Sequence, residues 1–158
     1  MRCSFTHITL VTLILSSASF ASPSPTKAQD KGARLLKSVA MDARQIQSAA
    51  SGLERLTKNS DATWKQYDRQ WNEIQPVVET MHMKIARLEA IGTSLSPNEK
   101  QALEQAKADY QKIAWRSRDL GKLVDMVPPD LSSQKFKIDS RDLAKEASDA
   151  AHVAKTQI

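Results

Sequence analysis

Apolar residues recur at alternating spacings of three and four along most of the chain, which is the period of an amphipathic α-helix. The pattern is cleanest between residues 61 and 91, where one apolar seam continues for about four heptads. Its members are Trp64, Tyr67, Trp71, Ile74, Val78, Met81, Ile85 and Leu88. The predicted helix therefore buries all of these side chains in a core, both tryptophans included.

Three other segments carry a similar pattern, over about residues 30–58, 96–127 and 132–158. Their expected inner faces are Leu36, Val39, Ala43, Ile46, Ala50 and Leu53 in the first, Leu103, Ala106, Tyr110, Ile113, Ser117, Leu120, Val124 and Val127 in the second, and Phe136, Ser140, Leu143, Ala147, Ala150 and Ala154 in the third. The last face is built from small residues, so it should contribute less burial energy per turn.

Helix-stopping and helix-capping residues separate the four segments. Asn59-Ser60-Asp61 offers caps for the second helix, and Gly92 a C-cap at its end. Ser96 and Glu99 form a capping box around Pro97, which predicts the start of the third helix. Pro128-Pro129 ends that helix. Pro76 falls on the outward side of the second helix, where the lost hydrogen bond faces water.

The expected fold is all-α. Only four glycines occur in the chain, and Ala, Lys, Gln, Leu and Glu are abundant, as in helical proteins. The connections are short, so neighbouring helices should be antiparallel. The sequence thus predicts an up-down-up-down four-helix bundle. The alternative is a set of helical hairpins that completes its core by dimerisation.

Residues 1–21 have the features of a secretory signal peptide. Arg2 precedes a short apolar run, and Ser19 and Ala21 place small residues where cleavage requires them. We expect cleavage after Ala21, a disordered Ser/Pro spacer over residues 22–29, and the helical domain over residues 30–158. The protein is then periplasmic or secreted. The apolar run of the signal is too short to span a bilayer, and no transmembrane segment is expected in the chain that remains after its removal.

Removal of the signal also narrows the available chemistry. The only cysteine, Cys3, lies within it, so disulfides, thiol catalysis and zinc–thiolate sites are excluded from the mature chain. The net charge falls from +5 to +4 with the loss of Arg2, and both signs are interspersed. Nucleic acid is not an expected partner, because binding it calls for a concentrated basic stripe.

Two acid-x-x-His pairs suggest a metal site, Glu79 with His82 and Asp149 with His152. Ferritin-like di-iron bundles use Glu-x-x-His pairs that point into the bundle. Here Val78 and Met81 occupy the seam, so Glu79 faces outward and His82 lies on the flank. Asp149 and His152 likewise face away from the inner face of their helix. These four residues are therefore weak metal candidates, and surface positions are the favoured interpretation.

Two sets of residues that contain methionine suggest other cofactors. Met41 and His152 are of the types that bind haem in cytochrome b562-like bundles, but both fall on outward faces. Met81-His82-Met83 could suit copper, yet Met81 belongs to the seam and Met83 to the opposite face. No cofactor is expected. A metal- or haem-binding bundle is retained as the alternative function.

Trp115 is the strongest candidate for a binding residue. It lies opposite the inner face of the third helix, with Lys112, Arg116, Arg118 and Lys122 around it. A large aromatic side chain among cations suits contact with a protein or an anionic polymer. The alternatives are that the lysine and arginine stems cover the indole, or that the helix register shifts and half-buries it.

The chain has no catalytic motif: neither a Gly-rich phosphate loop nor a Gly-x-Ser-x-Gly elbow is present. The segments 42–47, 68–74 and 113–118 (DARQIQ, DRQWNEI and IAWRSR) resemble those of small, uncharacterised, exported bacterial helical proteins. That resemblance implies bacterial export and no activity. The expected function is that of a non-enzymatic protein which binds a macromolecular partner, either a protein or an anionic component of the envelope. A homodimer is compatible with it.

Overall fold

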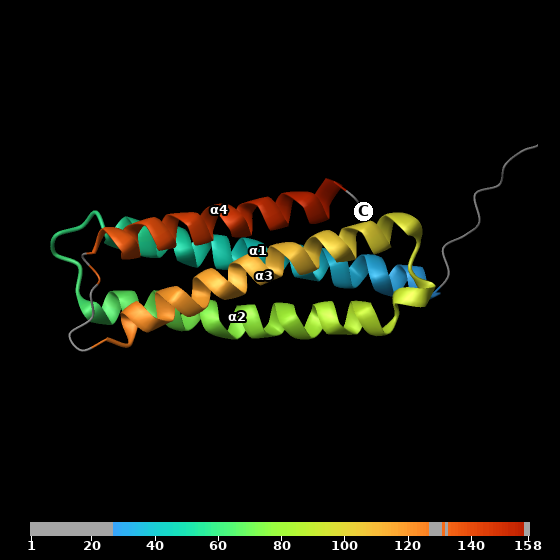
Figure 1. Cartoon of the computed structure of the whole chain (residues 1–158), viewed down its shortest axis with the longest axis horizontal. Coiled ribbons are helices and arrows are strands. Elements are labelled where there is room, and N and C mark those ends of the chain that lie inside the picture. The colour runs from blue at the N-terminus through green and yellow to red at the C-terminus, as the bar shows by residue number, and fades with distance from the viewer. Residues whose placement is uncertain (1–26, 127–130, 132, 157–158) are drawn as a thin grey trace, which may run out of the picture.

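Four antiparallel helices form a bundle (Figure 1). The computed structural model describes residues 27–126, 131 and 133–156. Within these, α1 spans Lys27–Leu56, α2 Trp64–Ala90, α3 Pro97–Val124 and α4 Gln134–Thr156, with a short 3-10 helix, η1, at Gly92–Ser94. The predicted signal peptide, spacer residues 22–26, Val127 and Pro128-Pro129 lie outside the described residues.

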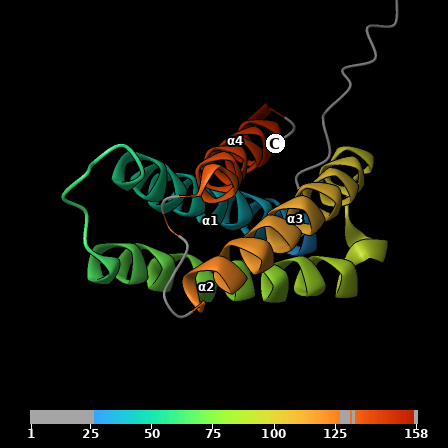
Figure 2. The ribbon, with the colours of Figure 1, turned by 60° about the vertical axis from the view of Figure 1, so that its left-hand side comes forward.

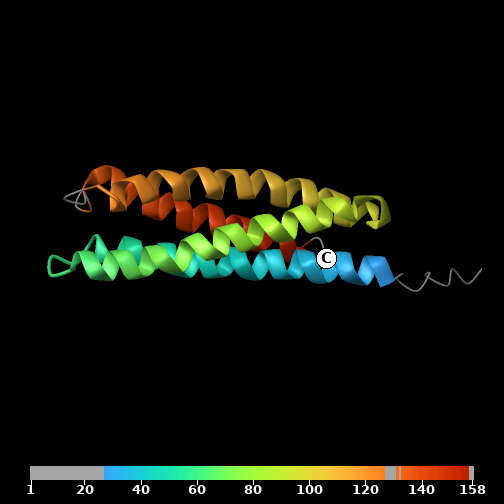
Figure 3. The same ribbon diagram turned by 90° about the horizontal axis from the view of Figure 1, so that it is seen from below.

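The helices are arranged so that each contacts its neighbours in chain order and α1 closes the bundle against α4. The α1–α4 contact is the most extensive, and the α2–α3 contact is the least extensive of the four neighbouring pairs. The α2–α3 contact is small because α3 crosses α2 at an angle, as Figures 1, 2 and 3 show. The predicted all-α four-helix bundle is confirmed, and its core is completed within one chain.

The predicted inner faces account for most of the core. All six residues assigned to the inner face of α1 are buried, as are Phe136, Ser140, Leu143, Ala147 and Ala150 of α4. Seven of the eight seam residues of α2 are buried as well: Tyr67, Trp71, Ile74, Val78, Met81, Ile85 and Leu88. Both α1 and α4 bury several alanines, namely Ala40, Ala43, Ala49 and Ala50 of α1 and Ala144, Ala147, Ala150 and Ala151 of α4.

The prediction for Trp64 was wrong, since its side chain is 47% exposed. The second helix begins at Trp64 rather than near Asp61, because Thr63 is its N-cap. The Thr63 N–H donates to Gln66 Oε1 at 2.7 Å, so this pair replaces the predicted cap at residues 59–61. Side chains of a first helical turn point back past the helix start, and Trp64 therefore lies beyond the core.

Other boundaries follow the predicted chemistry more closely. At the start of α3, Ser96 N–H donates to Glu99 Oε2 at 2.8 Å and Glu99 N–H donates to Ser96 Oγ at 3.3 Å, which confirms the capping box. The backbone N–H of Phe136 donates to Ser133 Oγ at 3.1 Å at the start of α4. The C-cap of α2 is Ile91 and not Gly92, which begins η1 instead.

The first helix begins at Lys27, three residues before the predicted start at Asp30, so the end of the predicted spacer is helical. Pro76 lies inside α2 on its exposed side, as predicted. Tyr110 differs from its prediction, because it is only partly buried at the edge of α3 that faces α2.

Candidate functional site

Trp115 lies on the solvent face of α3. On the opposite side of the helix, Ile113, Ser117 and Leu120 are buried and face the core. As a result, 54% of the Trp115 surface is exposed. The predicted outward orientation is thus observed, and the alternative of a register shift that half-buries the indole is not. An exposed tryptophan of this kind is a common anchor of protein interfaces.

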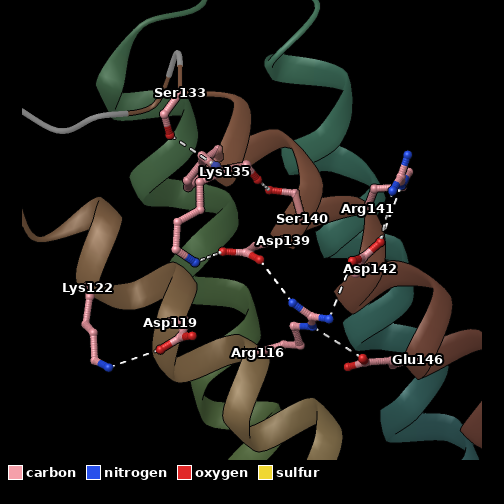
Figure 4. A network of polar contacts seen from close by, with 11 residues as sticks. Arg116, Asp119, Lys122, Ser133, Lys135, Asp139, Ser140, Arg141, Asp142 and Glu146 are labelled. Atoms are coloured by element: carbon pink, nitrogen blue, oxygen red, sulfur yellow. Dashed lines mark hydrogen bonds and ion pairs between the residues drawn. The ribbon is translucent and has the colours of Figure 1, made fainter.

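Arg116 does not belong to the solvent-facing cationic surface in which the sequence placed it. Its guanidinium turns toward α4 and contacts three carboxylates there (Figure 4). The distances are 3.1 Å to Asp139, 3.5 Å to Asp142 and 3.3 Å to Glu146. These acids are spaced at i, i+3 and i+7, so they share one face of α4. Arg116 therefore joins α3 to α4 and is not available as a partner contact.

Burial makes this cluster of Arg116 and three carboxylates structurally important. The Asp139 side chain is only 5% exposed, and Lys135 provides it with a second cation from one turn earlier. Glu146 Oε1 accepts a hydrogen bond from Arg116 Nε, while its buried Oε2 has no hydrogen-bond partner. Removal of the guanidinium would leave Glu146 without its cation and Asp139 with Lys135 alone, and loss of one partner is the costly case for a buried ion pair.

Trp115 also contacts Arg116. The Arg116 Cζ lies 4.8 Å from the centroid of the indole ring, within the range of a cation–π interaction. The prediction that arginine and lysine stems could cover the indole is thus partly correct. The indole packs over one cation and still keeps more than half of its surface in solvent.

The other cations predicted around Trp115 differ in whether a carboxylate forms an ion pair with them. Lys112 forms an ion pair with Asp109 at 3.3 Å. Lys122 pairs with Asp119 at 3.0 Å, and this hydrogen bond lowers the pKa of the Asp119 carboxyl. Arg118 is exposed, and no carboxylate among the described residues lies within ion-pair distance of it. It is therefore the cation beside Trp115 with the most capacity for an external anion.

A groove between α2 and α3 adjoins this surface. Its volume is about 390 Å³, and it follows from the oblique crossing of the two helices. Trp71, Val78, Ala114 and Gly121 contribute apolar surface, and polar groups line the rest: Gln75, Glu79, Tyr110, Ser117, Arg118, Lys122 and Asp125. The sequence pattern did not predict this groove, because a gap between helices depends on their crossing angle.

One end of the groove holds an aromatic pair. The rings of Tyr110 and His82 stack with centroids 5.3 Å apart, so they link α3 to α2. Burial raises the pKa of the Tyr110 phenol, the positive charge of Arg118 opposes that rise, and Glu79 adds to it. Tyr110 is one of the residues that line the groove, and a phenol can donate and accept hydrogen bonds.

The weak metal candidates are not brought together. Glu79 and His82 are exposed on α2, and Asp149 and His152 are exposed on α4, which lies diagonally across the bundle. Within the described part of the chain, no group of three His, Cys, Asp or Glu side chains is arranged to hold a metal ion. The acid-x-x-His pairs therefore lie on separate outer faces, as their seam positions predicted.

The methionine-containing sets do not point into the core together. Met41 is 61% exposed on α1 and His152 is exposed on α4, so both lie on outward faces. Met81 is fully buried in the core, whereas Met83 is 52% exposed. An intact α2 cannot bring the two thioethers of Met81 and Met83 to one ion, because they face opposite sides of it.

Comparisons with protein-family models, curated proteins and solved structures find no match to this chain. Among the described residues, none of the helices has an apolar stretch long enough to cross a membrane. The exposed Trp115, the cations beside it and the adjoining groove are therefore the features of the chain that can indicate a function.

Proposed function

We propose that this chain is an exported, non-enzymatic helical-bundle protein that binds a macromolecular partner in the cell envelope or outside the cell. The observation that carries the proposal is the exposure of Trp115, with 54% of its surface in solvent on a helix whose opposite face is core. Lys112 and Arg118 lie beside it and favour a partner that presents anionic groups. A protein and an anionic envelope component both fit this description.

The geometry favours binding over support of the fold. Trp115 packs against the Arg116 guanidinium, and 54% of its surface remains in solvent, where it gains nothing from the folded chain alone. Coverage of that surface by a partner would remove it from water, at roughly 25 cal/mol per Å². Lys112 and Arg118 keep their charged ends in solvent and can orient the partner as it approaches.

A comparison of two tryptophan variants tests the proposal. Full-length protein carrying Trp115→Ala should lose capture of its partner from native envelope fractions after chemical crosslinking. Trp64→Ala is the matched control, because Trp64 is similarly exposed, at 47%, but lies at the start of α2. Both variants should keep the helical circular dichroism of the wild type. Equal capture by the two variants, or unfolding of Trp115→Ala, would reject the proposed surface.

Export has a separate test. Intact mass and N-terminal sequencing of protein recovered from its host should give a chain that begins at Ser22. Recovery of a chain that retains residues 1–21 in the cytoplasmic fraction would contradict the proposed location. That result would leave the binding surface to be judged on the tryptophan variants alone.

A further inference from the structure

The groove between α2 and α3 has a charge pattern that selects among the partner classes considered above. Arg118 lies near the middle of the α3 residues that line it, Lys122 and Asp125 lie toward one end, and Glu79 lies toward the other end, near Tyr110. Lys122 is already paired with Asp119, so Arg118 is the cation left to bind an external group. A uniformly anionic polymer laid along this groove would face repulsion from Glu79 and Asp125.

The groove also offers apolar and hydrogen-bonding surface. Trp71 forms part of its lining, with 4% of its surface exposed. On the α3 side, Ala114 and Gly121 line the groove with little or no side chain. Ser117, Tyr110 and Gln75 provide hydroxyl and amide groups along its length. Apolar side chains and backbone amides of a polypeptide can use both kinds of surface.

We propose that this groove is the docking site for an acidic segment of a partner protein, whose carboxylate binds Arg118 while its apolar side chains pack toward Trp71. This inference rests on the proposed function and names the class of partner. Trp115 extends the same surface, because positions 115 and 118 are neighbours on one face of α3. The exposed indole then contacts the partner beside the inserted segment.

The length of the groove suits such a segment. The α3 residues that line it run from Tyr110 to Asp125, which at ~1.5 Å per residue corresponds to roughly 20 Å of helix. About six extended residues or four turns of helix span that distance. One acid at the centre of the segment would meet Arg118, and its ends would approach Glu79 and Asp125.

Site-specific photocrosslinking in the native host tests the proposal. The full-length protein carries p-benzoylphenylalanine in place of Gln75, an exposed residue of the groove lining. The same residue replaces Met41 on α1 as a control and Trp115 as a test of the surface itself. We expect a protein adduct from position 75 and none from position 41. Mass spectrometry should map the adduct to a partner segment that contains Asp or Glu.

Charge reversal supplies the decisive comparison. Arg118→Glu should reduce the adduct from position 75 at least about tenfold. Replacement of the mapped partner acid by Arg should restore it in that background. Arg118 is exposed and has no ion pair among the described residues, so this variant should retain the wild-type circular dichroism.

Several results would overturn the proposal. These are an adduct that survives Arg118→Glu, an adduct that maps to a segment without acids, an adduct to a non-protein polymer, and an adduct to a second copy of this chain. An adduct from position 115 but none from position 75 would reject the groove and leave the proposed function standing. The lack of an adduct from both positions would reject the two together.

Discussion

Gly121 on α3 lies directly against the indole of Trp71 on α2. A Cβ atom at position 121 would fall 2.7 Å from Trp71 Cζ2, closer than real Cβ atoms approach a neighbour. The ring is buried and cannot move away as a flexible chain end could. This close contact brings α2 and α3 together at the floor of the groove, and it makes glycine a packing requirement there.

Gly121→Ala should therefore destabilise the protein. Overpacking costs about 1–3 kcal/mol, and the better helix propensity of alanine offsets about 1 kcal/mol of that. Gly52→Ala is the matched control, because its Cβ would meet only the flexible end of the Gln70 side chain. Urea unfolding should show a net loss for Gly121→Ala and a gain of about 0.5–1 kcal/mol for Gly52→Ala. Equal shifts for both variants would contradict the contact.

Arg116→Met should destabilise the bundle by about 2 kcal/mol, because the buried Asp139 and Glu146 lose their shared cation. Lys135 still pairs with Asp139 and limits the loss. Arg118→Met should change the free energy of unfolding by less than about 0.5 kcal/mol, since that residue is an exposed surface position. A double-mutant cycle between Arg116→Met and Asp139→Asn measures the coupling, and additive effects would argue against the pair.

The ion pair between Lys84 and Asp42 should contribute strongly to the stability of the bundle. It joins α2 to α1 at 2.6 Å, and both side chains are largely buried. Lys84→Met leaves the Asp42 carboxylate without its cation and should cost about 3 kcal/mol in thermal unfolding. The double variant Asp42→Asn, Lys84→Met should recover much of that loss, because no buried charge remains. Failure of the second change to recover stability would contradict the explanation.

Alkaline pH should destabilise the protein through its two tyrosines. Burial raises the pKa of both Tyr67 and Tyr110, so the folded state releases their protons at higher pH than the unfolded state. The resulting stability is complete below pH 10 and is lost as pH rises through the folded-state pKa values. The slope is at most about 1.4 kcal/mol per pH unit for each tyrosine.

Absorbance of tyrosinate at 295 nm gives the direct measurement for this pH dependence. Both ionisation midpoints should lie above 10 in the folded protein and near 10 in urea. The Tyr67→Phe, Tyr110→Phe variant should lose most of the alkaline slope. A residual slope is expected from Lys107, whose pKa is raised by hydrogen bonds to Glu89 and Glu104. Normal midpoints in the folded state would contradict the burial argument.

The sequence predicted the helices and their buried faces because a repeating apolar seam depends only on helical geometry. It also predicted that Trp115 would face outward, for the same reason. The sequence did not predict that the Arg116 side chain turns toward α4, because that orientation depends on which face of α4 packs against α3. The i, i+3, i+7 spacing of Asp139, Asp142 and Glu146 was the available signal, because it places three acids on one stripe. The prediction for Trp64 was wrong because the sequence pattern did not identify Thr63 as the N-cap of α2.

The close packing of α1 against α4 has a consequence for how the chain acquires its structure. These are the first and last helices, so the most extensive interhelical contact joins residues that are far apart in the sequence. Until α4 is present, only the α1–α2 hairpin and α3 are available, and the face of α1 that packs against α4 stays uncovered. Completion of the core is therefore a late event, and a chain truncated before α4 should remain an open set of helices and a target for proteases.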